Sequence, residues 1–134
     1  MMISTKGRYA LRVMLDLAEQ DPGEFIPLKD IAARQEISEK YLEGILPVLI
    51  RNHFLEGHRG KGGGYRLTRP PETYTVASIL KLTERSLAPV SCLTCGKMEC
   101  DRADTCRTLP IWKELYRRTE EYLESVRLSD LLNS

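Results

Sequence analysis

All four cysteines of the chain lie within sixteen residues, in the stretch SCLTCGKMECDRADTC at positions 91–106. They are Cys92, Cys95, Cys100 and Cys106. Thiolates are soft, negatively charged ligands that bind zinc and iron–sulfur clusters, and closely spaced thiols also form reversible disulfides. The stretch therefore predicts a metal site, a cluster site or a redox switch, and the sequence does not select one disulfide pairing among those that four cysteines allow.

The residues around the thiols leave alternatives open. A zinc site would use the same four thiolates, but only Cys92 and Cys95 form a C-x-x-C pair, whereas structural zinc sites usually have two such pairs. A thiol switch is favoured by this pair and by nearby basic residues, while nearby acidic residues oppose it. Inert structural thiols fit poorly, because buried cysteines are not usually clustered in a polar, charged segment.

The bulk composition describes the protein that carries this segment. Its 134 residues suffice for one domain with a real core, and its 42% hydrophobic and 29% charged fractions are ordinary for a soluble globular protein. No apolar run is long enough to span a bilayer, and Arg12 and Asp16 interrupt the first run, which argues against a secretory signal. We therefore expect a cytoplasmic protein without membrane attachment, in a compartment where stable disulfides are rare.

Helical patterns predict three helices in the first part of the chain. Apolar residues recur at helical spacing over residues 5–19, and a second, shorter helix is expected over 27–35. Ser38 is a good N-cap for a third helix. Pro47 lacks an N–H group and clashes with the preceding turn, so we expect a kink or a break near Leu46. The buried face of the third helix is predicted to be Tyr41, Leu42, Ile45, Leu46 and Leu49, and the opposite face Glu39, Lys40, Glu43 and Gly44.

The hydrophobic period changes after the third helix. Residues 54–58 and 65–68 read as two short strands around the glycine-rich turn RGKGGG. A fourth helix capped by Thr75 and a long last helix from about Pro110 follow, with the cysteine segment between them. Two short helices joined by a brief turn and followed by a two-stranded wing are typical of a winged helix-turn-helix. We therefore predict a mainly α fold with a small β-hairpin, made of a winged helix-turn-helix domain and a long C-terminal helix.

The third helix is the candidate recognition helix, because the N-terminal part of that helix enters the major groove of DNA in such folds. The carboxylate of Glu43 can accept a hydrogen bond from cytosine, and Ser38 or Lys40 can reach a phosphate or a base edge. The alternative is an ordinary solvated face, and the helix alone does not decide between the two. The candidate contacts in this helix are Ser38, Glu39, Lys40, Tyr41 and Glu43.

The glycine-rich turn favours DNA binding. From Arg51 to Arg69 the chain has five Lys or Arg residues and one Glu, a local net charge of +4. Glycine supplies the positive φ of a hairpin turn, but a turn alone does not account for Arg59 and Lys61 among four glycines. Cations beside bare backbone fit close approach to DNA, with Arg59 in a narrow minor groove. The candidate contacts of the wing are Arg59, Gly60, Lys61 and Gly62.

Enzymatic function is not expected. Lys61 is followed by glycine and a strand rather than by Ser or Thr opening a helix, so the turn is not a nucleotide-binding P-loop. His53 and His58 have no nucleophile and orienting group near them in the sequence. A winged helix used for contacts with another protein is a further alternative, and it predicts binding that responds little to salt.

Three segments, followed by the clustered cysteines, resemble the Rrf family of bacterial winged-helix transcription regulators: KGRYALRVMLDLA, ISEKYLEGILPVLIRN and RGKGGGYRLTRPPETYTVASIL. The likeness covers nearly the whole chain. It implies a homodimer that binds double-stranded DNA at a pseudo-palindromic operator, with the last helix pairing with its copy, although a helix that packs on its own domain has the same apolar pattern. The implied dimer contacts are Ile111, Leu115, Thr119, Tyr122, Leu123 and Val126. Gly44 departs from the longer polar side chain that the family often has there.

In the cluster-binding members of this family, three cysteines between the fourth and last helices hold an iron–sulfur cluster, and Cys95, Cys100 and Cys106 are similar to them in spacing. Some members take the fourth ligand from a His just after the third cysteine, and others from an acid near the start of the first helix. This chain has neither, and Arg8 occupies the second of these places. Cys92 is the natural substitute and would complete an all-cysteine site for a 2Fe–2S or 4Fe–4S cluster. The sequence leaves two other roles open for Cys92, a resolving thiol for Cys95 or a bystander to the other three cysteines.

These observations combine into one expected organisation. We predict residues 1–88 as a winged helix-turn-helix DNA-binding domain, 89–109 as a cysteine-rich sensing loop, and 110–134 as a dimerisation helix and tail. The protein is expected to be a repressor, in which cluster loading or thiol oxidation reshapes the loop and shifts the spacing of two recognition helices. A thiol or disulfide switch without a cluster is the alternative.

Overall fold

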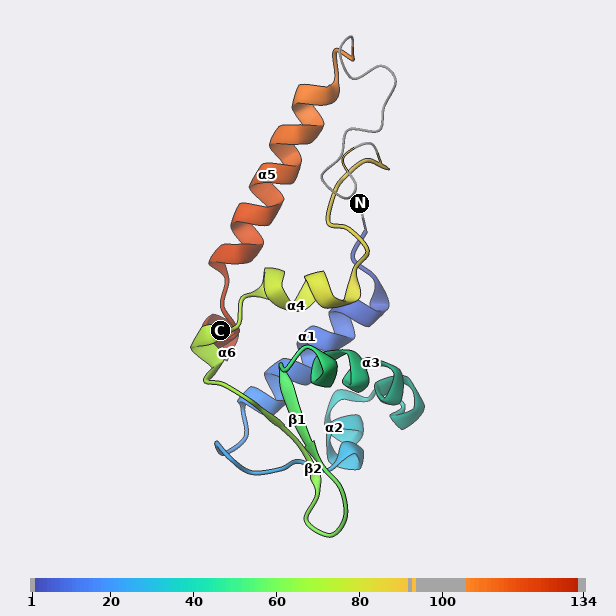
Figure 1. Ribbon diagram of the computed structural model, residues 1–134, viewed down its shortest axis with the longest axis vertical. Helices are drawn as coiled ribbons and strands as arrows, with labels where there is room; N and C mark the ends of the chain where they lie inside the picture. Colours follow the sequence, from blue (N-terminus) through green and yellow to red (C-terminus); the bar gives the residue numbers. More distant parts are fainter. Residues whose placement is uncertain (1, 92, 94–105, 133–134) are drawn as a thin grey trace.

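The computed structural model describes residues 2–91, 93 and 106–132. In chain order its elements are α1 (Thr5–Ala18), α2 (Leu28–Gln35), α3 (Glu39–Arg51), β1 (Leu55–His58), β2 (Gly64–Leu67), the 3₁₀ turn η1 (Pro71–Thr73), α4 (Val76–Thr83), α5 (Leu109–Ser125) and α6 (Leu128–Leu132). The antiparallel hairpin of β1 and β2 lies at one end of the molecule, and α5 extends toward the other end (Figure 1). The predicted fold class, a winged helix-turn-helix with a long C-terminal helix, is confirmed.

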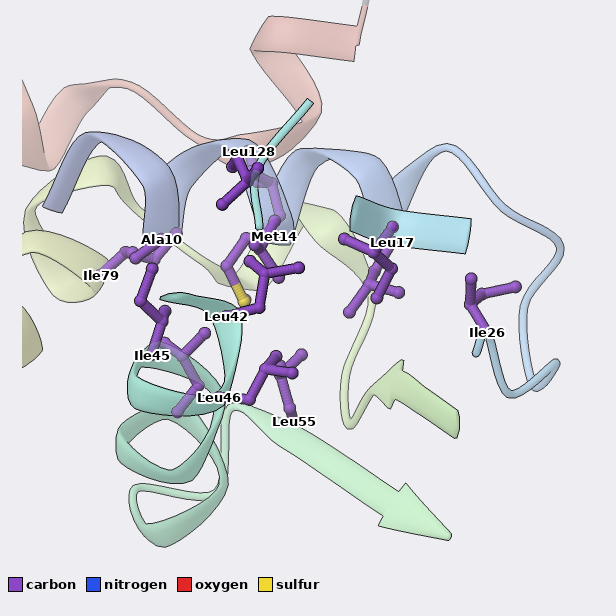
Figure 2. Packing of buried hydrophobic residues seen from close by; sticks show 14 of the residues in the cluster. Ala10, Met14, Leu17, Ile26, Leu42, Ile45, Leu46, Leu55, Ile79 and Leu128 are labelled. Atoms are coloured by element: carbon purple, nitrogen blue, oxygen red, sulfur yellow. The ribbon is translucent and has the colours of Figure 1, made fainter. Parts of the chain in front are cut away.

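The core is built around α1. Ser4 caps this helix, and its Oγ accepts a hydrogen bond from the Gly7 N–H at 3.0 Å. The apolar residues that recur at helical spacing are buried, as the sequence predicts: Ala10, Val13, Met14 and Leu17. Figure 2 shows this face of α1 packed with residues of α3 and β1, among them Leu46 and Leu55, in one cluster. Burial of this shared apolar surface is the main force that holds the helices together.

α3 continues through Pro47 from its start to its end, so of the kink or break that the sequence predicts near Leu46, the break does not occur. Leu46 and Leu49 on either side of the proline are both buried, and packing therefore holds both halves of the helix in place. The hydrogen bond that Pro47 cannot donate would go to the carbonyl of Glu43. Glu43 lies on the exposed face, where water can take the place of the missing donor.

The hairpin is attached to the loop between α1 and α2. Ile26 in that loop adds a single bridged residue to the edge of β2. Its N–H donates to the Tyr65 carbonyl at 2.9 Å, and its carbonyl accepts from the Tyr65 N–H at 2.8 Å. A two-stranded hairpin is marginal on its own, so this third, strand-like residue fixes the wing on the helical body.

α6 returns from α5 to the winged-helix domain, which the sequence pattern does not predict. Leu128, its first residue, is fully buried in the main core, and its N–H donates to the Tyr74 carbonyl at 2.9 Å. The Val76 N–H donates to the Val126 carbonyl, also at 2.9 Å. A helix of five residues gives no periodic signal in a sequence. The end of the chain thus completes the core of its first half.

A second apolar cluster joins α4 to α5. Val76, Leu80 and Leu87 form its buried centre. The partly buried residues packed on it are Ile3, Leu11, Tyr116, Leu123, Val126 and Leu131.

Of the helices that the structure describes, none combines the length and the apolar character needed to cross a bilayer.

Candidate DNA-binding surface and cysteine segment

A three-residue turn, Glu36–Ser38, joins α2 to α3. Glu36 has a left-handed backbone (φ 54°, ψ 44°), and its N–H bonds the Ala32 carbonyl to close α2. Ser38 then caps α3, because its Oγ accepts a hydrogen bond from the Tyr41 N–H at 3.1 Å. Ile37 between them is buried. The turn therefore fixes the angle between the two helices and leaves the first turn of α3 at the surface.

A buried carboxylate on α1 holds the end of α2. Asp16 is 1% exposed and accepts hydrogen bonds from Nε and Nη2 of Arg34 at 3.0 and 2.7 Å, and from Nε2 of Gln35 at 2.9 Å. The hydrogen bond to Asp16 raises the pKa of the Arg34 guanidinium. Arg12 also donates to the Gln35 carbonyl. Sequence reasoning treated Asp16 only as an interruption of an apolar run, although a lone acid on an otherwise apolar helix face was the available signal.

The exposed face of α3 carries the predicted major-groove residues. Ser38, Glu39, Lys40, Glu43 and Gly44 are all exposed. Tyr41 is 40% exposed, so its assignment to the buried stripe is wrong, whereas the other four stripe residues are buried. The Tyr41 ring meets the Tyr9 ring of α1 edge-on, with 5.2 Å between centroids. That these residues contact DNA stays a prediction.

The wing turn requires glycine for its own backbone. Gly60 and Gly62 have φ of 94° and 76°, a region that L side chains rarely adopt. A Cβ on Gly63 would lie 2.3 Å from a carbonyl oxygen of the same hairpin, and a Cβ on Gly64 would lie 2.2 Å from the Ile26 carbonyl oxygen. The geometry of the hairpin therefore accounts for all four glycines. The inference that they mark close approach to DNA loses its support, and the wing's part in binding rests on its charge.

Arg59 and Lys61 carry the positive charge of the turn. Both are exposed, and within the described part of the chain neither makes an ion pair or a side-chain hydrogen bond. Arg66 lies in β2, farther from the turn, and has partners in the protein. Its Nε donates to Glu56 at 3.0 Å, and its guanidinium lies 4.2 Å from the centroid of the Phe25 ring. Arg66 therefore anchors the wing, while Arg59 and Lys61 remain available to an anion such as a phosphate.

Tyr74 closes the base of the wing, and sequence reasoning gave it no role. Its side chain is fully buried, and its hydroxyl donates to the Phe54 carbonyl at 2.9 Å. The same oxygen accepts from the N–H groups of Thr68 and Arg69, both at 3.2 Å. One hydroxyl thus satisfies backbone groups just before β1 and just after β2, at the end of the hairpin that is opposite its turn. Phe54 lies 20 residues before Tyr74, so no local pattern predicts that the hydroxyl bonds the start of the hairpin as well as its end.

The structure describes one of the four predicted thiol ligands. Cys106 is half-buried, and its Sγ lies 3.4 Å from Oγ1 of Thr108. Cys92, Cys95 and Cys100 lie outside the described residues. Within the ranges that the structure describes, no group of His, Cys, Asp and Glu side chains is arranged to hold a metal ion. The predicted cluster or redox site therefore stays a prediction.

The chain enters the cysteine segment from a point that is tied to α1. Glu84 ends α4, and its carboxylate accepts hydrogen bonds from both the N–H and the Oγ of Ser4, the latter at 2.6 Å. A Cβ on Gly7 would lie 3.0 Å from this carboxylate, so the two helix ends are in close contact. A carboxylate at a helix N-terminus is also stabilised by the helix dipole. We call this pair of residues, Ser4 and Glu84, the α1–α4 clasp.

α5 turns one side toward its own chain and leaves another side exposed. Two residues of the predicted dimer set, Leu123 and Val126, pack on the cluster around α4, and Thr119 is half-buried. The remaining three are exposed by 59%, 39% and 67%: Ile111, Leu115 and Tyr122. Exposed apolar side chains in a row on one helix are typical of an interface between proteins. Pairing of α5 with a second copy stays a prediction.

The polar side of α5 is a chain of ion pairs. Glu114 pairs with Arg117 at 2.6 Å and with Arg118 at 2.8 Å, and Arg117 also pairs with Glu121. Hydrogen bonds from the two arginines lower the pKa of Glu114 to about 2, and the pKa of Arg117 is raised in turn. All of these groups are well exposed, so solvent and salt screen the pairs and their contribution to stability is small.

Comparison with known proteins agrees with this architecture. The sequence model of the Rrf2 family, described as an iron-dependent transcriptional regulator, matches residues 3–134. The HTH-type transcriptional regulator IscR of Yersinia enterocolitica is 34% identical over 134 residues, which cover the whole of this chain and 80% of the relative. The solved structure of T. potens IscR is 34% identical with a TM-score of 0.79, and the match covers 99% of this chain and 87% of that one. CymR of B. subtilis, described as its global cysteine regulator, is 32% identical with a TM-score of 0.81, over 98% of this chain and 95% of that one. The chain therefore belongs to the Rrf2 family of winged-helix transcriptional regulators.

Proposed function

We propose that the protein is a homodimeric repressor that acts in the cytoplasm, binds a pseudo-palindromic DNA operator, and responds to the state of its cysteine segment. The observation that carries this proposal is the capped, exposed first turn of α3, combined with a wing whose Arg59 and Lys61 have no protein partner in the described residues. In winged helices the recognition helix enters the major groove and positive charge beside it meets the phosphates.

Each surface residue has a role in this proposal. Ser38, Lys40 and Glu43 contact base edges or phosphates in the major groove, and Arg59 enters the minor groove. Lys61 pairs with a phosphate, and the remaining proposed contacts lie beside these residues: Glu39, Tyr41, Gly60 and Gly62. The carboxylate of Glu43 accepts from cytosine and is repelled by phosphate, so it selects sequence rather than adding affinity.

The exposed row of α5, Ile111, Leu115 and Tyr122, is the proposed dimer contact. A two-fold dimer places two copies of α3 on the half-sites of a palindrome. Replacing both Ile111 and Leu115 by Lys is expected to give monomers in sedimentation velocity at a concentration where the parent chain is dimeric. This test is cleaner than truncation before Pro110, because truncation also removes Leu128 from the core. A double variant that stays dimeric would contradict the assignment.

An iron–sulfur cluster fits the donor set, because four thiolates satisfy its irons without another ligand type. Cys92, Cys95, Cys100 and Cys106 would hold it, and it would supply a centre whose charge and stability respond to oxidants. The description of the family as iron-dependent and the likeness to IscR support this assignment. The likeness to CymR, described as a cysteine regulator, favours a thiol switch as the second candidate.

The residues that flank the thiols connect the cysteine segment to the proposed dimer helix α5 on one side and to α1 on the other. Cys106 lies three residues before Leu109, the buried first residue of α5, so a change at this thiol reaches the proposed dimer helix. On the other side the chain leads back to Glu84 and through the α1–α4 clasp to α1, against which α3 packs. Regulation requires that the two states of the segment differ in the arrangement of these helices.

The proposal is tested by anaerobic purification from iron-replete cells, followed by an absorbance spectrum and by iron, sulfide and zinc analysis. Visible absorbance with iron and sulfide supports the cluster, whereas colourless, iron-free protein whose DNA binding responds to thiol oxidants supports the switch. DNA binding itself is measured against salt. Several phosphate contacts predict a steep fall of affinity with rising salt, while affinity that barely responds to salt would replace the proposal with a protein-binding role.

A further inference from the structure

A groove of about 410 Å³ opens on the exposed face of the recognition helix. It lies between α3 and the first turn of α1, and its lining residues are Lys6, Ser38, Lys40, Tyr41, Gly44 and Ile45. Gly44 puts no side chain into this space, and a Cβ at this position would meet no atom within 4 Å. A longer side chain at Gly44 would therefore point into the groove, which lies on the surface that faces DNA in the proposed function.

The walls of the groove are mostly apolar. Ile45, which is 1% exposed, and Tyr41 are among its lining residues. The Oγ of Ser38 is already engaged as the helix cap, where it accepts the Tyr41 N–H. Lys6 and Lys40 also line the groove, and the apolar stem of a lysine can lie along such a wall while its ammonium group reaches water or phosphate. A polar base edge placed in this groove would lose hydrogen bonds to water and gain few in return.

One group on the base edges of the major groove is apolar, namely the C5-methyl group of thymine. We propose that the groove at Gly44 receives a thymine methyl group from each half-site, so that Gly44 determines sequence preference by having no side chain. Lys6 and Lys40 beside the groove complement the negative charge of the backbone that brings the base there. This inference rests on the proposed DNA binding and adds to it a preferred base at one position.

The size of the effect follows from burial of one methyl group. Removing a methyl group from an apolar contact lowers the binding constant about fourfold for each half-site. Uracil in place of thymine removes only this group, because the base keeps its hydrogen bonds and its pairing. The comparison therefore isolates the apolar contact from hydrogen-bonded readout.

The experiment uses the full chain and a duplex that this chain selects from a randomised pool. Each thymine of the half-site is replaced in turn by uracil, and affinities are compared for the parent chain and two variants, Gly44→Ala and Gly44→Gln. Ala adds only a Cβ, whereas Gln places a longer side chain in the part of the groove beside position 44. Both are better helix formers than Gly, so neither weakens α3, and the pair differs in the length and polarity of the added side chain.

The expected result is one thymine position per half-site at which uracil weakens binding about fourfold for the parent and for Gly44→Ala, but not for Gly44→Gln. If uracil lowers the affinity at no position, or if it lowers the affinity of Gly44→Gln as much as that of the parent, the groove does not receive a thymine methyl group, while DNA binding stands. Complete loss of binding by Gly44→Gln would also overturn this inference, since the groove would then not accept a side chain. A parent chain that selects no duplex overturns both this inference and the proposed function.

Discussion

Replacement of Asp16 by Ala removes the acceptor that holds the end of α2, and with it the turn before the recognition helix. The carboxylate is 1% exposed and accepts three side-chain hydrogen bonds, two of them from Arg34. Hydrogen bonds to charged groups are worth about 1.5–3 kcal/mol each. Because Arg34 is 41% exposed, water recovers part of its two bonds. We therefore expect Asp16→Ala to lower the free energy of unfolding by about 3 kcal/mol and the melting temperature by about 10 °C.

The assay is urea unfolding followed by circular dichroism, with Glu19→Ala as the matched control. Glu19 is an exposed acid at the end of the same helix, and its replacement is expected to change stability by less than about 0.5 kcal/mol. A double-mutant cycle with Arg34→Ala should give a coupling energy of about 1.5–3 kcal/mol. Effects of Asp16→Ala that match the control, or effects of the two replacements that simply add, would refute the view that this pair holds α2 on α1.

Three other predictions concern the wing, the clasp and α5. Tyr74→Phe leaves three backbone groups without their partner, so we expect a loss of about 2 kcal/mol in urea unfolding; a loss below about 0.5 kcal/mol would contradict the closing role of the hydroxyl. Glu84→Gln keeps the size of the side chain but removes its charge. We expect the variant to bind DNA nearly as tightly as the parent chain, while its DNA affinity changes less when the cysteine segment is oxidised. An unchanged response to oxidation would show that the α1–α4 clasp does not transmit the change. Glu114 should titrate in carbon-13 NMR with a pKa of about 2, against an ordinary value of 4.5, so its ion pairs remain at pH 4 and are lost as pH falls through about 2. Arg117→Gln should return the pKa of Glu114 toward its ordinary value. A pKa near 4.5 for Glu114 in the parent chain would refute the pairing.

Local signals predicted most of the secondary structure. The apolar period of α1, the caps Ser38 and Thr75, and the hairpin around RGKGGG are all properties of a few neighbouring residues, and the structure confirms each of them. A serine or threonine hydroxyl caps the N–H groups that follow it wherever the helix lies in the fold. These elements could therefore be assigned without knowing what packs against them, and their order was enough to indicate a winged helix.

Other features depend on partners that are distant in the sequence. The expected break at Pro47 fails because buried leucines on both sides hold α3 in the core, an effect that propensity does not include. Tyr41 occupies a position of α3 that the sequence pattern assigns to the buried face, yet its ring is exposed and contacts the ring of Tyr9. The roles of Asp16 and Tyr74 follow from hydrogen bonds to residues on other elements, and no spacing rule reveals them.

The sequence by itself thus determined the fold class, the recognition helix, the wing and the identity of the candidate thiol ligands, because each is written in residue types and short spacings. Tertiary structure decided how these parts are held and joined. It placed α6 in the core, closed the wing with Tyr74, connected α4 to α1 through Ser4 and Glu84, and opened a groove at Gly44. These properties arise only when chain segments far apart in sequence come within contact distance, and burial then gives a single side chain several partners.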